Sequence, residues 1–193
     1  PRPNDTLGVA MIGVGTQGHG LLQAVQAVEN AEVRVICDLY TGNIRRAQGL
    51  CTNDKVRIVK EWERVVEDKD IDAVVVAVPD FMHARMTAAA AQNKKDVYVE
   101  KGWCVTLDEA KKMRAAVKDN KVVMQLGHHY NSAPAMHKAR EIFRSGALGK
   151  VPLVRTYIDR SSSLPEWQLY TDYSIRELPK DATPENIDWK RFI

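Results

Sequence analysis

Cysteine is scarce in this sequence, and the few residues present are not spaced for a metal or for a set of disulfides. There are three among 193 residues, Cys37, Cys51 and Cys104, an odd number without a C-x-x-C pair. This spacing indicates neither a disulfide framework nor a zinc site, and we predict no metal ligands. We interpret each cysteine as a small buried apolar side chain.

Long apolar runs and dense basic segments are also missing. No run reaches the ~18 residues that a membrane-spanning helix needs, and the net charge is only +3. We therefore expect no membrane and no nucleic acid among the partners. No signal peptide is recognisable, although a chain starting at Pro1-Arg2-Pro3 would look the same after processing or trimming.

A glycine-rich turn is the most informative motif that the sequence does contain. The apolar run of residues 9–12 leads into Gly13, Gly15 and Gly18, spaced G-x-G-x-x-G, and a helix-like segment follows at once. In a strand–turn–helix unit such glycines permit a tight turn, close approach of a pyrophosphate and close helix packing. We predict that this loop binds a dinucleotide through Gly13, Val14, Gly15, Thr16, Gln17 and Gly18.

An acidic residue at the expected distance strengthens this interpretation. Asp38 follows a second strand-like run, residues 32–37, and lies twenty positions after Gly18. A carboxylate there can accept hydrogen bonds from the adenosine ribose, which favours NAD. Arg45 and Arg46 could instead meet the 2′-phosphate of NADP, but Asp38 would repel that phosphate. NADP is therefore the less favoured cofactor, and a solvated helix face is the simpler interpretation of the two arginines.

Strand-like and helix-like segments alternate with short links up to about residue 128. The run of residues 71–78 is rich in β-branched residues, as expected of a central parallel strand. This alternation predicts an α/β fold, a Rossmann-type doubly wound parallel sheet. Ligands of such sheets bind beyond the carboxyl ends of the strands. Five segments should meet there: 13–18, Asp38, 79–83, 100–101 and 128–130.

The character of the sequence changes after this region. Residues 151–161 read as one longer strand, and no further alternation follows. We predict a dinucleotide-binding domain over residues 1–128. Residues 129–193 should then be the beginning of a second domain, an α+β open sheet that looks truncated.

Lys101 is the strongest candidate for chemistry. It comes one residue after a predicted central strand, at the cofactor edge. A lysine beside a substrate hydroxyl can stabilise developing negative charge on the oxygen or take part in proton transfer. Glu100 could orient it, whereas the simpler alternative is an exposed ion pair at a strand end.

Taken together, the motifs resemble the glucose–fructose oxidoreductase / inositol dehydrogenase family (Gfo/Idh/MocA). The matching segments are 13–18, Asp38, 76–83, 100–101, 127–134 and 145–151. The resemblance implies an NAD(P)-dependent enzyme for a sugar, polyol or related hydroxyl compound. It also implies a C-terminal open-sheet domain that makes homo-oligomers and contacts the substrate.

The resemblance assigns roles to particular residues. The family motif Glu-Lys-Pro falls on Glu100, Lys101 and Gly102, so Lys101 inherits the catalytic role, although the glycine leaves its loop freer. The family's downstream Asp and His have no counterpart here, and neither His128 nor His129 is promoted to general base. The remaining residues predicted at the cofactor edge are Ala77, Val78, Pro79, His83, Glu100 and His129.

Three functions are compatible with these residues. The first is hydride transfer at a hydroxyl carbon, and the second is NAD-dependent glycoside cleavage by transient oxidation and elimination. The third is a dinucleotide-binding module without catalysis. We expect a cytoplasmic protein, with export to the periplasm by the twin-arginine route as the alternative.

Overall fold

A six-stranded parallel sheet forms the centre of the molecule, which a computed structural model describes over residues 6–157 and 181–192. The strand order is β3-β2-β1-β4-β5-β6, and every neighbouring pair is parallel. This order is the doubly wound arrangement, so the predicted Rossmann-type fold is confirmed. The strands are β1 (Leu7–Ile12), β2 (Ala31–Cys37), β3 (Arg57–Val59), β4 (Ala73–Val76), β5 (Asp96–Glu100) and β6 (Met124–Gly127).

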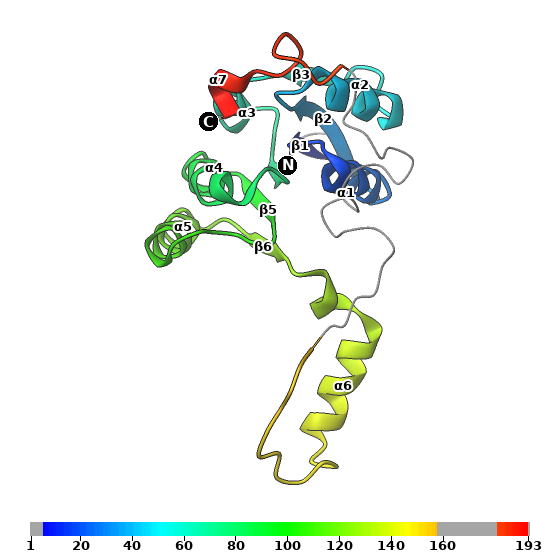
Figure 1. Ribbon diagram of the computed structural model, residues 1–193, viewed down its shortest axis with the longest axis vertical. Helices are drawn as coiled ribbons and strands as arrows, with labels where there is room; N and C mark the ends of the chain where they lie inside the picture. The colour runs from blue at the N-terminus through cyan, green and yellow to red at the C-terminus, as the bar shows by residue number, and fades with distance from the viewer. Residues whose placement is uncertain (1–5, 158–180, 193) are drawn as a thin grey trace.

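Helices cover both faces of this sheet (Figure 1). Helices α1 and α2 lie on one face, and α3, α4 and α5 lie on the other. Because all six strands are parallel, their carboxyl ends lie at the same edge of the sheet. The helices are α1 (Thr16–Gln26), α2 (Thr41–Leu50), α3 (Trp62–Glu67), α4 (Asp80–Gln92) and α5 (Leu107–Asn120).

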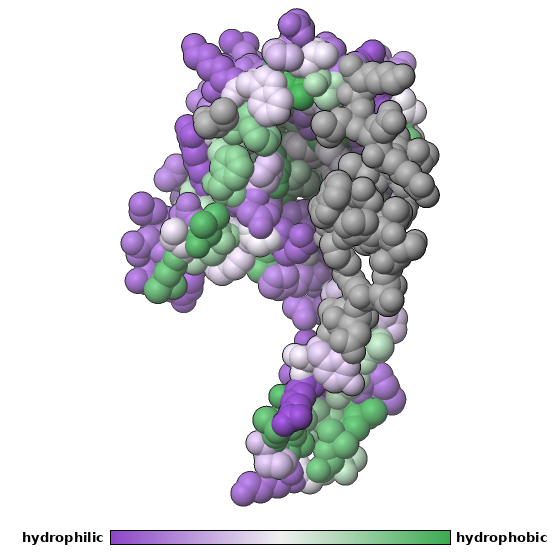
Figure 2. Space-filling view, viewed as in Figure 1, coloured by the Kyte–Doolittle hydropathy of each residue, from purple (hydrophilic) through white to green (hydrophobic). Residues whose placement is uncertain are grey.

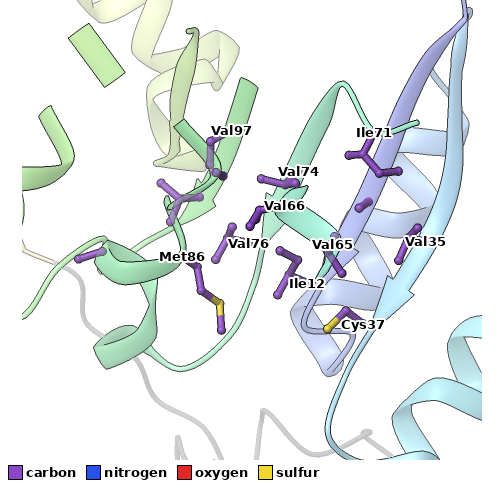
Figure 3. Packing of buried hydrophobic residues seen from close by; sticks show 14 of the residues in the cluster. Ile12, Val35, Cys37, Val65, Val66, Ile71, Val74, Val76, Met86 and Val97 are labelled. Atoms are coloured by element: carbon purple, nitrogen blue, oxygen red, sulfur yellow. The ribbon is translucent and has the colours of Figure 1, made fainter. Parts of the chain in front are cut away.

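Side chains from alternating strand positions build two separate cores. Ala10 and Ile12 of β1 pack towards α3–α5, whereas Val9 and Met11 pack towards α1 and α2. Because β1 is buried on both faces, it reads as a continuous apolar run rather than as an alternating pattern. Figure 3 shows the larger core, in which Ile12 of β1 and Val76 of β4 lie near Met86 of α4.

Beyond β6 the chain leaves the sheet and forms an arm (Figure 1). A short 3-10 helix, η1 (His129–Ser132), leads into α6 (Pro134–Arg144), and residues 145–157 run back without forming a strand. We call residues 129–157 the arm. The predicted strand over residues 151–161 is wrong for 151–157, because within the described ranges no strand pairs with them; residues 158–161 lie outside the described chain.

The last described segment returns to the sheet. Residues 181–192 end in α7 (Trp189–Phe192) and pair with the chain just after β2, through a bridge between Tyr40 and Ile187. We call residues 181–192 the return segment. The second domain predicted for residues 129–193 stays a prediction.

No helix within the described ranges is long and apolar enough to cross a membrane.

Candidate cofactor and active site

Two glycines of the loop, Gly13 and Gly18, pack so closely against neighbouring backbone that a side chain would not fit. Gly13 has φ +84°, and a Cβ on it would lie 2.4 Å from the carbonyl oxygen of Ala77. A Cβ on Gly18 would lie 2.3 Å from the carbonyl oxygen of Gly13. A larger residue at either position would therefore push β1, β4 and α1 apart. The loop needs glycine at these two positions for its backbone path, independently of any ligand.

Gly15 differs because the space around it is open. The nearest atom to a Cβ placed there would be Nδ2 of Asn43, at 3.9 Å. Gly15 is the N-cap of α1 and has no side chain that could occupy the helix start. Backbone N–H groups at such a helix start favour a phosphate. The open space at Gly15 is thus available to a ligand.

Asp38 lies directly against this loop. Its Oδ2 accepts a hydrogen bond from the backbone N–H of Val14 at 2.8 Å, and its Oδ1 accepts one from Tyr40 N–H, also at 2.8 Å. The Asn43 amide adds longer contacts of 3.3 and 3.4 Å. The carboxylate is thereby held in one orientation between the loop and α2. Arg46 hydrogen-bonds to Asn43 and Arg45 pairs with Asp181 of the return segment, and both arginines are exposed on α2, as the interpretation of a solvated helix face predicts.

A cavity of about 490 Å³ opens between these elements. The glycine loop and Asp38 form one side, and the link from β4 to α4 forms another. The return segment contributes a third side through Ile187 and α7. Of the predicted cofactor residues, the cavity is lined by Gly13, Gly15, Asp38, Ala77, Val78 and Pro79.

A second group of predicted residues meets around the buried carboxylate of Glu100. Gln17 Nε2 donates to Glu100 Oε1 at 3.0 Å, and His129 Nε2 lies 3.0 Å from the same oxygen. Tyr98 O–H adds a contact of 3.3 Å. Because a carboxylate only accepts, His129 must carry its proton on Nε2. Glu100 therefore ties the glycine loop, the end of β5 and η1 together.

Hydrogen bonding decides the charge state at this carboxylate. Burial raises the pKa of Glu100, but the hydrogen bonds from His129 and Gln17 outweigh it and leave the pKa below its ordinary value. Burial and the neighbouring Glu100 charge raise the pKa of Tyr98 to about 12. Glu100 is thus a carboxylate near neutral pH, and Tyr98 keeps the proton that it shares with it.

Lys101 lies at the exposed end of β5, beside this network. Its backbone N–H donates to Glu100 Oε2 at 3.3 Å. Within the described residues, Glu100 holds the backbone of Lys101 and not its ammonium group. The simpler alternative, an exposed ion pair at the strand end, is therefore not formed between Glu100 and the Lys101 ammonium, and the catalytic role of Lys101 stays a prediction.

His83 forms a hydrogen bond with the loop that follows Lys101. Its side chain is buried in α4, and its Nδ1 lies 2.8 Å from the carbonyl oxygen of Gly102. A carbonyl only accepts, so Nδ1 carries the proton. His83 is consequently neither a helix cap nor a cavity-lining residue. It fixes the position that the family's proline would stiffen, immediately after Lys101.

The remaining predicted residues have structural roles or lie apart. Thr16 is exposed at the start of α1, and His128 is exposed before η1. Cys37 is buried, and burial together with the Asp38 charge raises the pKa of its thiol to about 12. Among residues 6–157 and 181–192, no group of three or more His, Cys, Asp or Glu is placed to hold a metal.

Two features of the site were not anticipated from the sequence. The return segment lines the cavity with Trp189 and Phe192, although it lies about 150 positions after Asp38 along the chain. The available sequence signal was the spacing of Trp189 and Phe192, which are three positions apart and so lie on one face of a helix. Gly127 is the second feature, since a Cβ on it would lie 2.5 Å from the Tyr98 hydroxyl and 3.1 Å from Glu100 Oε1.

Comparison with known proteins gives one consistent result. Levoglucosan dehydrogenase from Pseudarthrobacter phenanthrenivorans is 30% identical over 138 residues, which is 69% of this chain and 35% of that protein. The 2,7-anhydro-N-acetylneuraminate hydratase of Escherichia coli is 27% identical over 141 residues, 73% of this chain and 37% of its own length. The chain thus spans between about a third and a half of the curated relatives that it matches.

A solved structure agrees with these relatives. Levoglucosan dehydrogenase in complex with NADH and levoglucosan superimposes with a TM-score of 0.67 at 27% identity, over 75% of this chain and 41% of that one. A family model described as "Oxidoreductase family, NAD-binding Rossmann fold" matches residues 7–128. The chain therefore belongs to this oxidoreductase family, GFO_IDH_MocA.

Proposed function

We propose that this chain is the dinucleotide-binding part of an NAD-dependent oxidoreductase that acts on a hydroxyl carbon of a sugar, a polyol or a related compound. The observation that carries the proposal is the hydrogen-bonded carboxyl edge of the sheet. There Asp38 holds the glycine loop through Val14, and Glu100 holds the same loop through Gln17. The glycine loop thus connects the proposed adenosine end of the site, at Asp38, with the proposed reactive end, at Glu100.

The residues of this edge suit the cofactor. The cavity beside Asp38 has room for an adenosine, since ligand pockets for small molecules have volumes from about 300 Å³ upward. The open space at Gly15 would receive the pyrophosphate at the start of α1. The carboxylate of Asp38 suits two ribose hydroxyls and opposes a 2′-phosphate, which favours NAD over NADP.

Lys101 would act on the substrate oxygen. Its ammonium lies free of Glu100 and can donate a hydrogen bond to a hydroxyl, while in its neutral form Nζ can take the hydroxyl proton. Bound NAD would supply the acceptor for the hydride that leaves the same carbon. Glu100 and His83 position the backbone on either side of Lys101, at its own N–H and at the Gly102 carbonyl.

Replacement of Lys101 tests the catalytic assignment. In Lys101→Ala we expect turnover of a responsive sugar or polyol to fall about 100-fold or more, the usual contribution of an acid–base group, because the variant lacks the amine that would act on the substrate oxygen. NAD affinity, measured by calorimetry, should stay within about twofold of the wild type. Glu141→Gln on the exposed face of α6 is the control and should leave both quantities unchanged.

Two results would contradict the assignment in different ways. Undiminished turnover in Lys101→Ala with NAD bound would remove Lys101 from the chemistry. NAD binding by the wild type without turnover of any compound in a broad sugar and polyol panel would favour a binding module without catalysis.

Asp38→Ala tests the choice of cofactor. Removing the carboxylate should weaken NAD binding and reduce the preference for NAD over NADP, because the repulsion of the 2′-phosphate is lost. The measurement is the pair of dissociation constants for NAD and NADP in both proteins. An unchanged ratio would contradict the ribose role of Asp38.

Glycoside cleavage by transient oxidation is the second candidate function. It is favoured by the relative named as a hydratase, whose name describes no net oxidation. Incubation with glycosides separates the two functions. Release of free sugar without accumulation of NADH would support cleavage, whereas NADH formed in proportion to the oxidised product would support the dehydrogenase.

A further inference from the structure

The return segment forms part of the cavity wall although nothing in its sequence marks it as a cofactor motif. We propose that residues 181–192 are a structural part of the adenosine site, in which Trp189 and Phe192 cover the adenine ring. The inference rests on the proposed NAD function, and it assigns a binding role to a segment outside residues 7–128.

Backbone contacts fix this segment to the part of the chain that carries Asp38. Thr41 N–H donates to the Asn186 carbonyl at 3.0 Å, and Asp188 N–H donates to the Leu39 carbonyl at 3.1 Å. These bonds lie on either side of the Tyr40–Ile187 bridge. Because Leu39 immediately follows Asp38, these bonds hold the return segment at a fixed position relative to the Asp38 carboxylate, the proposed ribose ligand.

Side chains hold the two ends of the segment as well. At the start, the Tyr40 hydroxyl donates to Asp181 Oδ1 at 2.5 Å, and Arg45 pairs with the same carboxylate. At the end, Arg191 lies 3.8 Å from both Glu61 and Glu63 at the beginning of α3. The segment is therefore anchored to α2 and α3, one on each side of the sheet.

Three aromatic rings line the cavity at this wall. Phe192 makes edge contacts with Trp189 at 5.7 Å and with Phe81 of α4 at 6.1 Å between ring centres. All three line the cavity, yet 45% of Trp189, 37% of Phe192 and 48% of Phe81 remains exposed. Figure 2 shows apolar atoms on this side of the molecule near α7 and α4. A purine ring in the cavity would cover surface that the protein leaves open.

The position of the return segment places it at the adenine end of a bound NAD and not at the nicotinamide end. The cavity that it lines also contains Asp38 and the β4–α4 link. Lys101 and His129, at the proposed reactive end, do not line it. The wall should therefore affect every ligand that carries an adenosine and should leave the reactive end unaffected.

The test measures binding of ADP-ribose and of NAD by calorimetry to the full 193-residue chain. In Trp189→Ala and in Phe192→Ala we expect both ligands to bind about 5- to 100-fold more weakly, the range found for loss of one base–aromatic stack. The factor should be the same for the two ligands, since both contain the adenosine. Phe143→Ala, which removes an exposed aromatic side chain on α6 away from the cavity, is the control and should bind normally.

A conservative variant guards against a folding defect. Trp189→Phe keeps an aromatic ring and should retain most of the affinity, and circular dichroism without ligand should be the same in all variants. If both alanine variants bind ADP-ribose as the wild type does, the wall has no binding role, and the NAD proposal stands. If the wild type binds neither ligand, the NAD proposal fails and this inference fails with it.

Discussion

Glu100 illustrates how one buried carboxylate can join several elements of the fold. Its oxygens receive hydrogen bonds from Gln17 of α1, from His129 of η1 and from its own strand through Tyr98. A buried charge with several donors is stable only while all of them are present. The consequence is that a change at any of these three elements alters the backbone at Lys101.

Replacement of this carboxylate by an amide has a predictable effect on stability. At pH 7 we expect Glu100→Gln to lower the free energy of unfolding by about 1–3 kcal/mol. The amide has no negative charge to strengthen the bonds from His129 and Gln17, and its NH₂ group would replace the oxygen that accepts from Lys101 N–H. The folded-state pKa of Glu100 lies below its ordinary value of 4.5. The advantage of the wild type should be complete above pH 4.5 and disappear as the pH falls through the lower folded-state pKa.

Urea denaturation of both proteins from pH 7 to pH 3 provides the measurement. Glu141→Gln is the control, since Glu141 pairs with Lys138 on an exposed helix face and such pairs contribute little. A difference between wild type and Glu100→Gln that stays constant over this pH range would show that the carboxylate charge is not what stabilises the fold.

At the scale of elements, sequence patterns within a few residues correctly predicted individual strands, turns and helices. The glycine spacing and the buried run at β4 each lie within a few residues, and each formed the expected element. The Gln17–Glu100 contact joins residues 83 positions apart and depends on sheet order. The failed strand at 151–157 has the same cause, because a pattern of apolar residues does not specify a pairing partner.

The start of α5 offers a test at this scale. Thr106 accepts a hydrogen bond from Glu109 N–H at 3.2 Å, and Glu109 accepts one from Thr106 N–H at 2.9 Å. We expect Thr106→Ala to lower the free energy of unfolding by about 1 kcal/mol, the usual effect of losing an N-cap. Thr106→Ser keeps the hydroxyl and should cost far less. Equal urea midpoints for Thr106→Ala and the wild type would contradict a stabilising capping box.

At the scale of the whole molecule, the sheet and the arm are built differently. Each strand contributes side chains to one or both cores, whereas no residue of α6 is buried. Apolar side chains on the arm are instead open to solvent, and Figure 2 shows them grouped at its end. The most exposed are Tyr130, Phe143, Leu148, Leu153, Val154 and Tyr157, which are 58–81% exposed. His129 ties the start of the arm to Glu100, whereas α6 has no buried residue, and homo-oligomerisation through a second domain stays a prediction.

This exposed surface should be detectable by a hydrophobic dye. We expect the 193-residue chain to enhance the fluorescence of anilinonaphthalene sulfonate without any denaturant, since exposed apolar patches bind such dyes. The double variant Phe143→Ser, Leu153→Ser should reduce the enhancement. Val28→Ser removes an equally exposed apolar side chain outside the arm and serves as the control. A signal unchanged in the double variant would place dye binding elsewhere.

The bridge between Tyr40 and Ile187 has a kinetic consequence. It joins residues 147 positions apart (187 − 40), whereas the contacts within each βα unit are local. Closing so long a loop is entropically costly, so contacts of this range form late during folding. We expect the sheet to assemble first and the return segment to dock afterwards. In native-state hydrogen exchange, the amides of Thr41 and Asp188 should accordingly open before those of β1 and β4.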